Sequence, residues 1–168
     1  MTGHRARVDA VPDPRDIPGD FPHRVKVPVR LADTDAFAHV NNATYLTYFE
    51  IGRLEYLAAA ERHPVPIPTL GGRRSYILAE ARVTFRSQAA YGETLTLETR
   101  VGRVGRTSLT MEHRITTPHP VDPGGPARLV AVGETILVRF DYDLQGPVRF
   151  EDELVAALER FERRPLRV

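Results

Sequence analysis

The chain has 168 residues, of which 42% are hydrophobic and 27% are charged, and 23 basic residues against 22 acidic ones leave a net charge of +1. This balance is typical of one globular domain, which can bury most of its apolar surface without a metal or a disulfide staple. There are no cysteines, which excludes a disulfide framework, a thiol nucleophile and Cys-ligated zinc or iron–sulfur sites. The near-neutral charge gives no support to a nucleic-acid partner.

The N-terminal segment, residues 1–21, is rich in proline, arginine and aspartate and is predicted to be a flexible arm. It lacks the apolar run of a leader peptide, and no stretch of the chain reaches the roughly 18 apolar residues of a membrane-spanning helix. We therefore expect residues 22–168 to form a single domain that is located in the cytoplasm and has no membrane partner.

The first predicted element is a strand over 23–31, where apolar and polar side chains alternate. Pro28 cannot donate a ladder hydrogen bond, so this strand is expected at an edge or at a bulge. A polar, turn-prone stretch follows at 32–42. From Ala43 to about Arg62 the sequence predicts a long helix with an asparagine as its N-cap. Its apolar side chains point in nearly every direction, so we expect it to be buried on most sides.

The rest of the chain is predicted to be mostly strands, over Ser75–Arg86, Thr94–Val104, Thr107–Thr116 and Arg128–Phe140. A long loop at 117–126 separates the last two strands, and an amphipathic helix over 151–161 follows them. His113 is predicted to be a core or interface histidine on the inward face of its strand. One helix that needs burial, followed by antiparallel strands, favours an α+β fold in which a curved sheet wraps around the helix.

Asp33, Asp35 and His39 cluster where the first strand gives way to a loop, directly before the long helix. One interpretation is purely structural, because Asp, Thr and Asn supply turn and capping oxygens. A second makes the three side chains metal ligands, and a third makes the two acids a pair that shares acid–base work. A fourth places one carboxylate beside the helix N-terminus, whose N–H groups stabilise an oxyanion, which suits acyl transfer without a cofactor.

Residues 33–46 read DTDAFAHVNNATYL and are followed by YFEIGR at 48–53. This run resembles the signature D-x-D-x-x-G-H-V-N-N-x-x-Y of acyl-CoA thioesterases of the 4-hydroxybenzoyl-CoA thioesterase type, which have the hotdog fold. The resemblance extends from about Pro22 to Leu166 and includes a second, more general segment at 83–94. It implies an α+β hotdog domain with its antiparallel sheet around the helix of residues 43–62. It also implies hydrolysis of an acyl-CoA thioester with no metal or other cofactor.

By this resemblance Asp35 is the catalytic carboxylate, acting as nucleophile or general base, and the backbone N–H at Asn42 polarises the thioester carbonyl. His39 matches a motif residue whose role varies across the family. We expect it first to order the loop as a hydrogen-bond partner and only second to take part in catalysis. The family's glycine before this histidine is Ala38 here, so we expect the loop backbone and the pocket shape to differ.

Arg103, Arg106 and Ser108 lie at a predicted hairpin where hotdog enzymes often bind the phosphates of CoA. Arginine suits phosphate because its fork binds in a bidentate manner. All but one of the basic residues are arginines, however, so a solvated hairpin tip explains these residues equally well.

The partners expected from the resemblance are an acyl-CoA substrate and further copies of the chain, as a homodimer or homotetramer. The strand over 128–140 is long and apolar and would invite aggregation as an exposed edge, which also predicts an oligomer. Two alternatives remain, a catalytically silent hotdog domain that binds acyl-CoA or serves in assembly, and a thioesterase acting on an acyl carrier protein. Asp35 favours an enzyme, because a binding module has no need of a carboxylate beside an anionic substrate.

Overall fold

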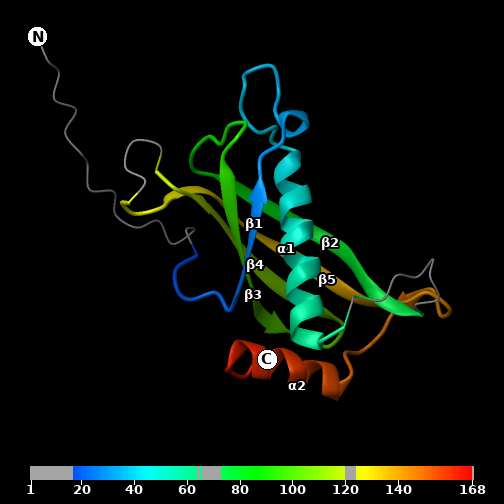
Figure 1. The fold of residues 1–168 in the computed structure, drawn as a ribbon. Helices are drawn as coiled ribbons and strands as arrows, with labels where there is room; N and C mark the ends of the chain where they lie inside the picture. Colours follow the sequence, from blue (N-terminus) through cyan, green and yellow to red (C-terminus); the bar gives the residue numbers. More distant parts are fainter. Residues whose placement is uncertain (1–16, 64, 66–72, 120–123, 168) are drawn as a thin grey trace, which may run out of the picture.

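The computed structural model of the protein describes residues 17–63, 65, 73–119 and 124–167. Its elements in chain order are β1 (His23–Pro28), the short 3-10 helix η2 (Leu31–Asp33), α1 (Thr44–Glu61), β2 (Arg74–Phe85), β3 (Thr94–Val104), β4 (Ser108–Thr117), β5 (Arg128–Asp141), β6 (Gly146–Pro147) and α2 (Asp152–Glu162). The strands form a six-stranded antiparallel sheet, and α1 lies along one of its faces (Figure 1). The predicted α+β class is confirmed.

The predicted elements are all present, with ends that differ by a few residues at most. β6 was not predicted, because two residues are too short to carry a periodic pattern. β1 pairs only with β3 and so lies at the edge of the sheet, as Pro28 indicated. Most of the predicted N-terminal arm, residues 1–16, and positions 120–123 of the predicted loop lie outside the described residues.

α1 packs on the sheet through one side only. Its buried residues are Tyr45, Tyr48, Phe49, Gly52, Arg53, Tyr56, Leu57 and Ala60. The prediction of burial on most sides is wrong for the single chain, because Leu46 and Leu54 on the other side are 42% and 47% exposed. A single sheet covers one side of a helix and leaves the apolar residues of the opposite side in contact with solvent. In the part of the chain that the structure describes, no helix is long and apolar enough to cross a membrane.

Gly52 brings α1 close to β3. A Cβ atom built at this position would lie 2.6 Å from the Thr99 hydroxyl oxygen, which is closer than real Cβ contacts come. The missing side chain therefore sets the distance between the helix and the sheet. The second tight contact is between Gly133 of β5 and the Phe49 ring, which a Cβ at Gly133 would overlap.

The strand order of the sheet is β1-β3-β4-β5-β2, so β5 is an interior strand paired on both sides. The prediction that the strand over 128–140 would need a partner copy as an exposed edge is wrong. The edge on this side is β2, whose residues 77–82 are exposed and whose pairing with β5 shifts between Leu78 and Glu80. The apolar pattern of β5 results from its burial between neighbours, which is typical of interior strands.

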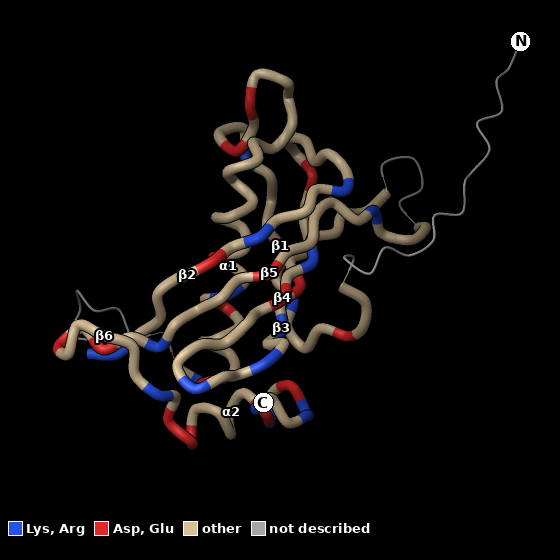
Figure 2. Tube along the Cα trace, turned by 180° about the vertical axis from the view of Figure 1, so that it is seen from behind, with Lys and Arg blue, Asp and Glu red and all other residues tan. Residues whose placement is uncertain are grey.

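Charged residues recur along β3 and β4 (Figure 2), at positions that alternate with the buried ones. Arg114 pairs with Glu98 and Arg100 pairs with Glu112, both at 2.5 Å. The two guanidinium groups lie over the ring of Phe21, at 4.5 Å for Arg114 and 4.7 Å for Arg100. Phe21, the last residue of the predicted arm, is thus buried against the sheet.

Candidate active site

The loop before α1 closes as a short hairpin with Asp35 at its neck. Thr34 and Val40 pair across the hairpin as an isolated bridge. The Asp35 N–H donates to the His39 carbonyl at 2.9 Å, and the Ala38 N–H donates to the Asp35 carbonyl at 3.0 Å. These backbone hydrogen bonds hold Asp35 in one position relative to the start of the helix.

Ala38 has the left-handed backbone conformation that favours glycine, with φ of 61°. A non-glycine residue pays roughly 1–2 kcal/mol for this conformation. Ala38 therefore bears a strain that a glycine at this position would not have.

The Asp33 carboxylate is buried and fully engaged in holding the loop. It accepts hydrogen bonds from the Arg30 guanidinium at 2.7–3.2 Å, from the Arg30 N–H at 2.8 Å and from the Tyr48 hydroxyl at 3.1 Å. The Arg30 guanidinium is the main cause that lowers the pKa of Asp33. Burial, followed by the charge of Asp33, raises the pKa of Tyr48. Asp33 is thus a structural anchor, and it does not form an acid–base pair with Asp35.

The Asp35 carboxylate lies in a different environment, at the wall of a pocket of about 390 Å³. The side chains and backbone that line this pocket are those of Asp35, Phe37, His39, Val40, Asn42, Tyr45, Phe85, Arg86, Ser87 and Gln88. Within the described ranges, the one hydrogen bond that the carboxylate accepts comes from the Phe37 N–H, to Oδ1 at 2.9 Å. Oδ2 is therefore available to a ligand in the pocket.

Asn42, two residues before α1 begins at Thr44, lines the same pocket. Asn41 orders the turn before α1, whose N-cap is Ala43 and not the asparagine that was predicted, since its Oδ1 accepts the Ala43 N–H and its carbonyl accepts the Thr44 N–H, both at 2.9 Å. The Asn42 N–H between them donates to no acceptor among the described residues. An N–H group at a helix N-terminus carries the positive end of the helix dipole, which favours a developing negative charge.

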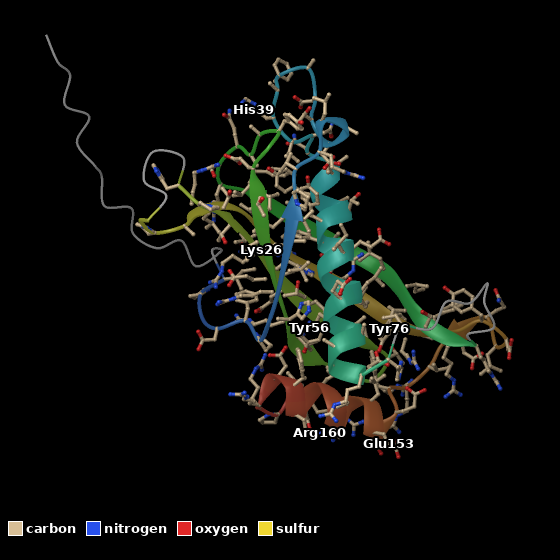
Figure 3. All side chains as sticks on the ribbon, viewed as in Figure 1. Lys26, His39, Tyr56, Tyr76, Glu153 and Arg160 are labelled. Carbon is tan, nitrogen blue, oxygen red and sulfur yellow. The ribbon has the colours of Figure 1, made fainter. Side chains whose placement is uncertain are left out.

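His39 also lines the pocket, and it orders the loop through its backbone. Its carbonyl accepts the Asp35 N–H, and its backbone pairs with Ala90 as an isolated bridge. The imidazole has no hydrogen-bond partner in the described part of the chain. Figure 3 shows His39 near the end of the molecule where the loop meets the sheet. Asp35, His39 and Asn42 are therefore brought together, as their motif indicated.

Sequence reasoning missed the opposite wall of the pocket, which comes from Phe85 and the segment after β2. The Phe85 ring meets Tyr45 of α1 edge to face, with centroids 5.1 Å apart. The N–H groups of Arg86 and Ser87 both donate to the Val130 carbonyl, at 2.8 and 3.1 Å. This wall depends on the pairing of β2 with β5, for which no local signal exists in the sequence.

Arg103, Arg106 and Ser108, the expected CoA-phosphate residues, lie at the other end of the sheet. β3 separates the Thr94 end, near the Asp35 loop, from the hairpin after Val104, and its length is about 33 Å at 3.3 Å per residue. α2, with Arg160, lies at that far end as well (Figures 1 and 3). Within one chain these residues and Asp35 do not belong to one site.

In the described ranges, no group of three or more His, Cys, Asp or Glu side chains is arranged to hold a metal ion. Asp33 faces Arg30 and Tyr48, so the triad of Asp33, Asp35 and His39 does not converge on one point. The arrangement that does exist is one carboxylate and one helix N-terminus on a shared pocket. Such a site can attack or hydrate a carbonyl while stabilising its oxyanion.

The chain is similar to known proteins that are described as thioesterases. A family model described as the thioesterase-like superfamily matches residues 29–158. A thioesterase from Thermus thermophilus, solved in complex with coenzyme A and zinc, is 29% identical over 87% of this chain and 98% of its own, with a TM-score of 0.71. No curated protein matches the chain.

Two further solved structures show the same fold. A thioesterase-superfamily protein from Jannaschia sp. CCS1 is 22% identical, covers 89% of this chain and 88% of its own, and has a TM-score of 0.72. A 1,4-dihydroxy-2-naphthoyl-CoA thioesterase from Synechocystis is 18% identical, covers 80% and 93%, and has a TM-score of 0.68. The expected hotdog architecture is confirmed.

Proposed function

Since the chain belongs to the thioesterase-like superfamily and is a thioester hydrolase, we propose that it cleaves an acyl-CoA thioester into the free acid and coenzyme A, with Asp35 as the reacting carboxylate. The observation that carries the proposal is that Asp35 and Asn42 line one pocket directly before α1. The CoA bound to the Thermus thermophilus relative supports a CoA thioester as the substrate.

In this proposal the thioester carbonyl oxygen lies against the Asn42 N–H at the start of α1. The hydrogen bond and the helix dipole stabilise the oxyanion that forms when the carbonyl carbon is attacked. An N–H that is already free of protein acceptors needs no rearrangement to bind this oxygen.

Asp35 can supply the attack in two ways. As a nucleophile, its Oδ2 bonds to the carbonyl carbon, the CoA thiolate leaves, and water then hydrolyses the resulting anhydride. As a general base, Oδ2 takes a proton from water while the water oxygen bonds to the carbon, and that proton leaves with the CoA sulfur. Both routes consume one water and release the acid and CoA. His39 lines the pocket as a second polar group, and its backbone holds Asp35 in place.

The proposal includes a homo-oligomer, as a dimer or tetramer, located in the cytoplasm. The exposed β2 edge supports self-association, because unpaired strand edges are sites of pairing with another chain. Arg103, Arg106 and Ser108 are about 33 Å along the sheet from the Asp35 end. For them to bind CoA phosphates at an active site, the hairpin of a second copy must reach the pocket.

The test is thiol release from a panel of acyl-CoA thioesters, measured for the wild type and for Asp35→Asn. The substitution keeps the side-chain shape and removes the charge, so turnover of the best substrate should fall by about 100-fold or more. Affinity for the substrate should hold or improve, since repulsion from an anionic ligand is removed. Undiminished turnover would rule out Asp35. Binding of acyl-CoA without turnover by the wild type would indicate a silent binding domain, and turnover of carrier-protein thioesters alone would indicate the other alternative.

A further inference from the structure

A second cavity adjoins the Asp35 pocket and shares part of its lining. This cavity has a volume of about 610 Å³ and shares His39, Arg86, Ser87 and Gln88 with the first. Together the two form one groove, which we call the His39 groove and which is lined by the residues of both pockets. Its Asp35 end holds the proposed reacting carboxylate, and its other end is lined by Ala89, Ala90, Glu93 and Arg128.

The floor of the His39 groove is held in place by hydrogen bonds from several directions. The Ser87 hydroxyl donates to the Leu129 carbonyl at 2.6 Å and accepts from the Arg128 guanidinium at 2.8 Å. The Val40 N–H donates to the Ala89 carbonyl at 2.8 Å, which joins the groove to the Asp35 loop. The groove is thus shaped before a ligand enters, which favours specific binding.

Positive charge exceeds negative charge in the second cavity. Arg128 is anchored there by an ion pair with Glu93 at 2.8 Å, and the Glu93 carboxylate also accepts the Ala90 N–H at 3.2 Å. Glu93 is therefore already satisfied inside the protein. Arg86 is a second arginine that lines both cavities, and His39 lines both as well.

We propose that the Arg86 end of the His39 groove binds an anionic group, a carboxylate or a phosphate, that the thioester substrate carries. Arg86 provides a planar fork that suits either group, and Gln88 and Arg128 line the same space as further donors. The inference rests on the proposed function, because the groove reaches the reacting carboxylate. It places the anion site on the same chain and on the same pocket as Asp35, unlike the residues at the β3–β4 hairpin.

The anion has two possible sources, the phosphates of CoA or a carboxylate at the end of the acyl chain. Three thioesters separate them: hexanoyl-CoA carries only phosphates, adipoyl-pantetheine carries only an acyl carboxylate, and hexanoyl-pantetheine carries neither. kcat and KM for each are measured with the wild type, with Arg86→Gln and with Arg86→Lys. The matched control is Arg82→Gln in β2, four residues before Arg86. The Arg82 side chain is 68% exposed and pairs with Glu80 and Glu134.

The expected result is that Arg86→Gln raises KM by about tenfold or more for the thioester whose anion binds at Arg86, since hydrogen bonds to charged groups are worth this much. KM for hexanoyl-pantetheine and every constant of Arg82→Gln should stay within about twofold, because surface charges contribute little. A loss with hexanoyl-CoA assigns the phosphates, and a loss with adipoyl-pantetheine assigns the carboxylate. Arg86→Lys should retain part of the affinity through its charge.

The proposal is overturned if Arg86→Gln leaves all three KM values unchanged, or if Arg103→Gln/Arg106→Gln causes the anion-dependent loss and Arg86→Gln does not. If Arg86→Gln does not fold, the salt dependence of KM in the wild type tests the proposal instead. Its KM for the anionic thioester must rise with NaCl concentration while that for hexanoyl-pantetheine stays constant, and equal responses overturn the proposal. A wild type that hydrolyses none of the three thioesters overturns the proposed function itself, and the anion site with it. Normal turnover of hexanoyl-pantetheine with no effect of Arg86→Gln overturns the anion site alone.

Discussion

The imidazole of His113 stacks on the ring of Phe49, with the centroids 4.5 Å apart and the ring planes 18° from parallel. Its Nε2 lies 2.9 Å from the Thr135 hydroxyl and its Nδ1 lies 3.3 Å from the Thr99 hydroxyl. His113 is buried between α1 and the sheet, which confirms its prediction as a core histidine. A neutral imidazole can form hydrogen bonds with both threonine hydroxyls. A protonated imidazole would place a charge in the core.

This burial predicts a loss of stability in mild acid. Desolvation by burial, with the charge of Arg53 as a second cause, lowers the pKa of His113 from 6.5 to about 3. Below pH 6.5 His113 is protonated in the unfolded chain but stays neutral in the folded protein. The free energy of unfolding therefore falls by about 1.4 kcal/mol per pH unit down to about pH 3. Urea unfolding at pH 7 and pH 5 should show a loss of about 2 kcal/mol from this residue alone. In His113→Gln the loss of unfolding free energy between pH 7 and pH 5 should be smaller by this contribution of His113. If the variant and the wild type lose the same amount, His113 is not a buried neutral imidazole.

The two aspartates of the loop should separate stability from catalysis. Asp33→Asn removes the charge that Arg30 and the Tyr48 hydroxyl bind, and should lower the free energy of unfolding by about 1–3 kcal/mol. Asp35→Asn should leave the melting temperature close to that of the wild type and lower turnover by about 100-fold or more instead. Thermal unfolding and thiol release, measured on both variants, check this. An equal loss of turnover at full stability in both variants would mean that the two acids share the chemistry.

Ala38 offers a stabilising substitution. Ala38→Gly removes the left-handed strain of roughly 1–2 kcal/mol. The glycine also loses more conformational entropy on folding than alanine does, which costs about 0.5–1 kcal/mol. The net gain should be about 0.5–1 kcal/mol, seen as a higher midpoint in urea unfolding. Ala36→Gly in the same loop is the matched control, since Ala36 has no positive φ and glycine there should only destabilise. A destabilised Ala38→Gly would show that the strain at φ of 61° is small.

The N-terminal arm should contribute stability mainly through Phe21, because the hydrogen bonds that Arg100 and Arg114 donate to the Asp20 and Gly19 carbonyls are exposed. Deleting residues 1–20 removes few apolar groups and should leave the melting temperature almost unchanged. Phe21→Ala in the full chain removes a buried ring from beneath Arg100 and Arg114 and should cost about 3 kcal/mol. Differential scanning calorimetry on both proteins tests the contrast. A large destabilisation by the deletion would show that residues before Phe21 are bound to the domain.

Local patterns predicted the elements and half of the site. The alternation in β3 and β4, the Pro28 edge and the compact run from Asp33 to Asn42 are encoded by neighbours in sequence, and the structure places them as expected. The Asp35 pocket also contains residues that are distant in the sequence. Arg86 lies about fifty residues beyond Asp35, and both line this pocket because the pairing of β2 with β5 positions the end of β2.

Strand order was the other unpredictable property. An apolar run such as β5 indicates burial, but burial by neighbouring strands and by a partner copy leave the same pattern in the sequence. The same holds for α1, where Leu46 and Leu54 are as apolar as the buried residues and yet lie on the side that the sheet does not cover. Which surface covers an apolar residue is decided by tertiary packing, and the pattern of a single sequence does not reveal it.

The close approach at Gly52 makes the spacing between layers part of the catalytic geometry. Eight residues, or about 12 Å of helix, separate Gly52 from Thr44, the first residue of α1, and a helix transmits displacement along its axis as a stiff rod. A side chain added at Gly52 would collide with Thr99 and move α1 away from the sheet. The proposed oxyanion donor, the Asn42 N–H, would move with the helix. In the proposed mechanism, the position of the polarising Asn42 N–H thus depends on a single absent carbon atom in the core.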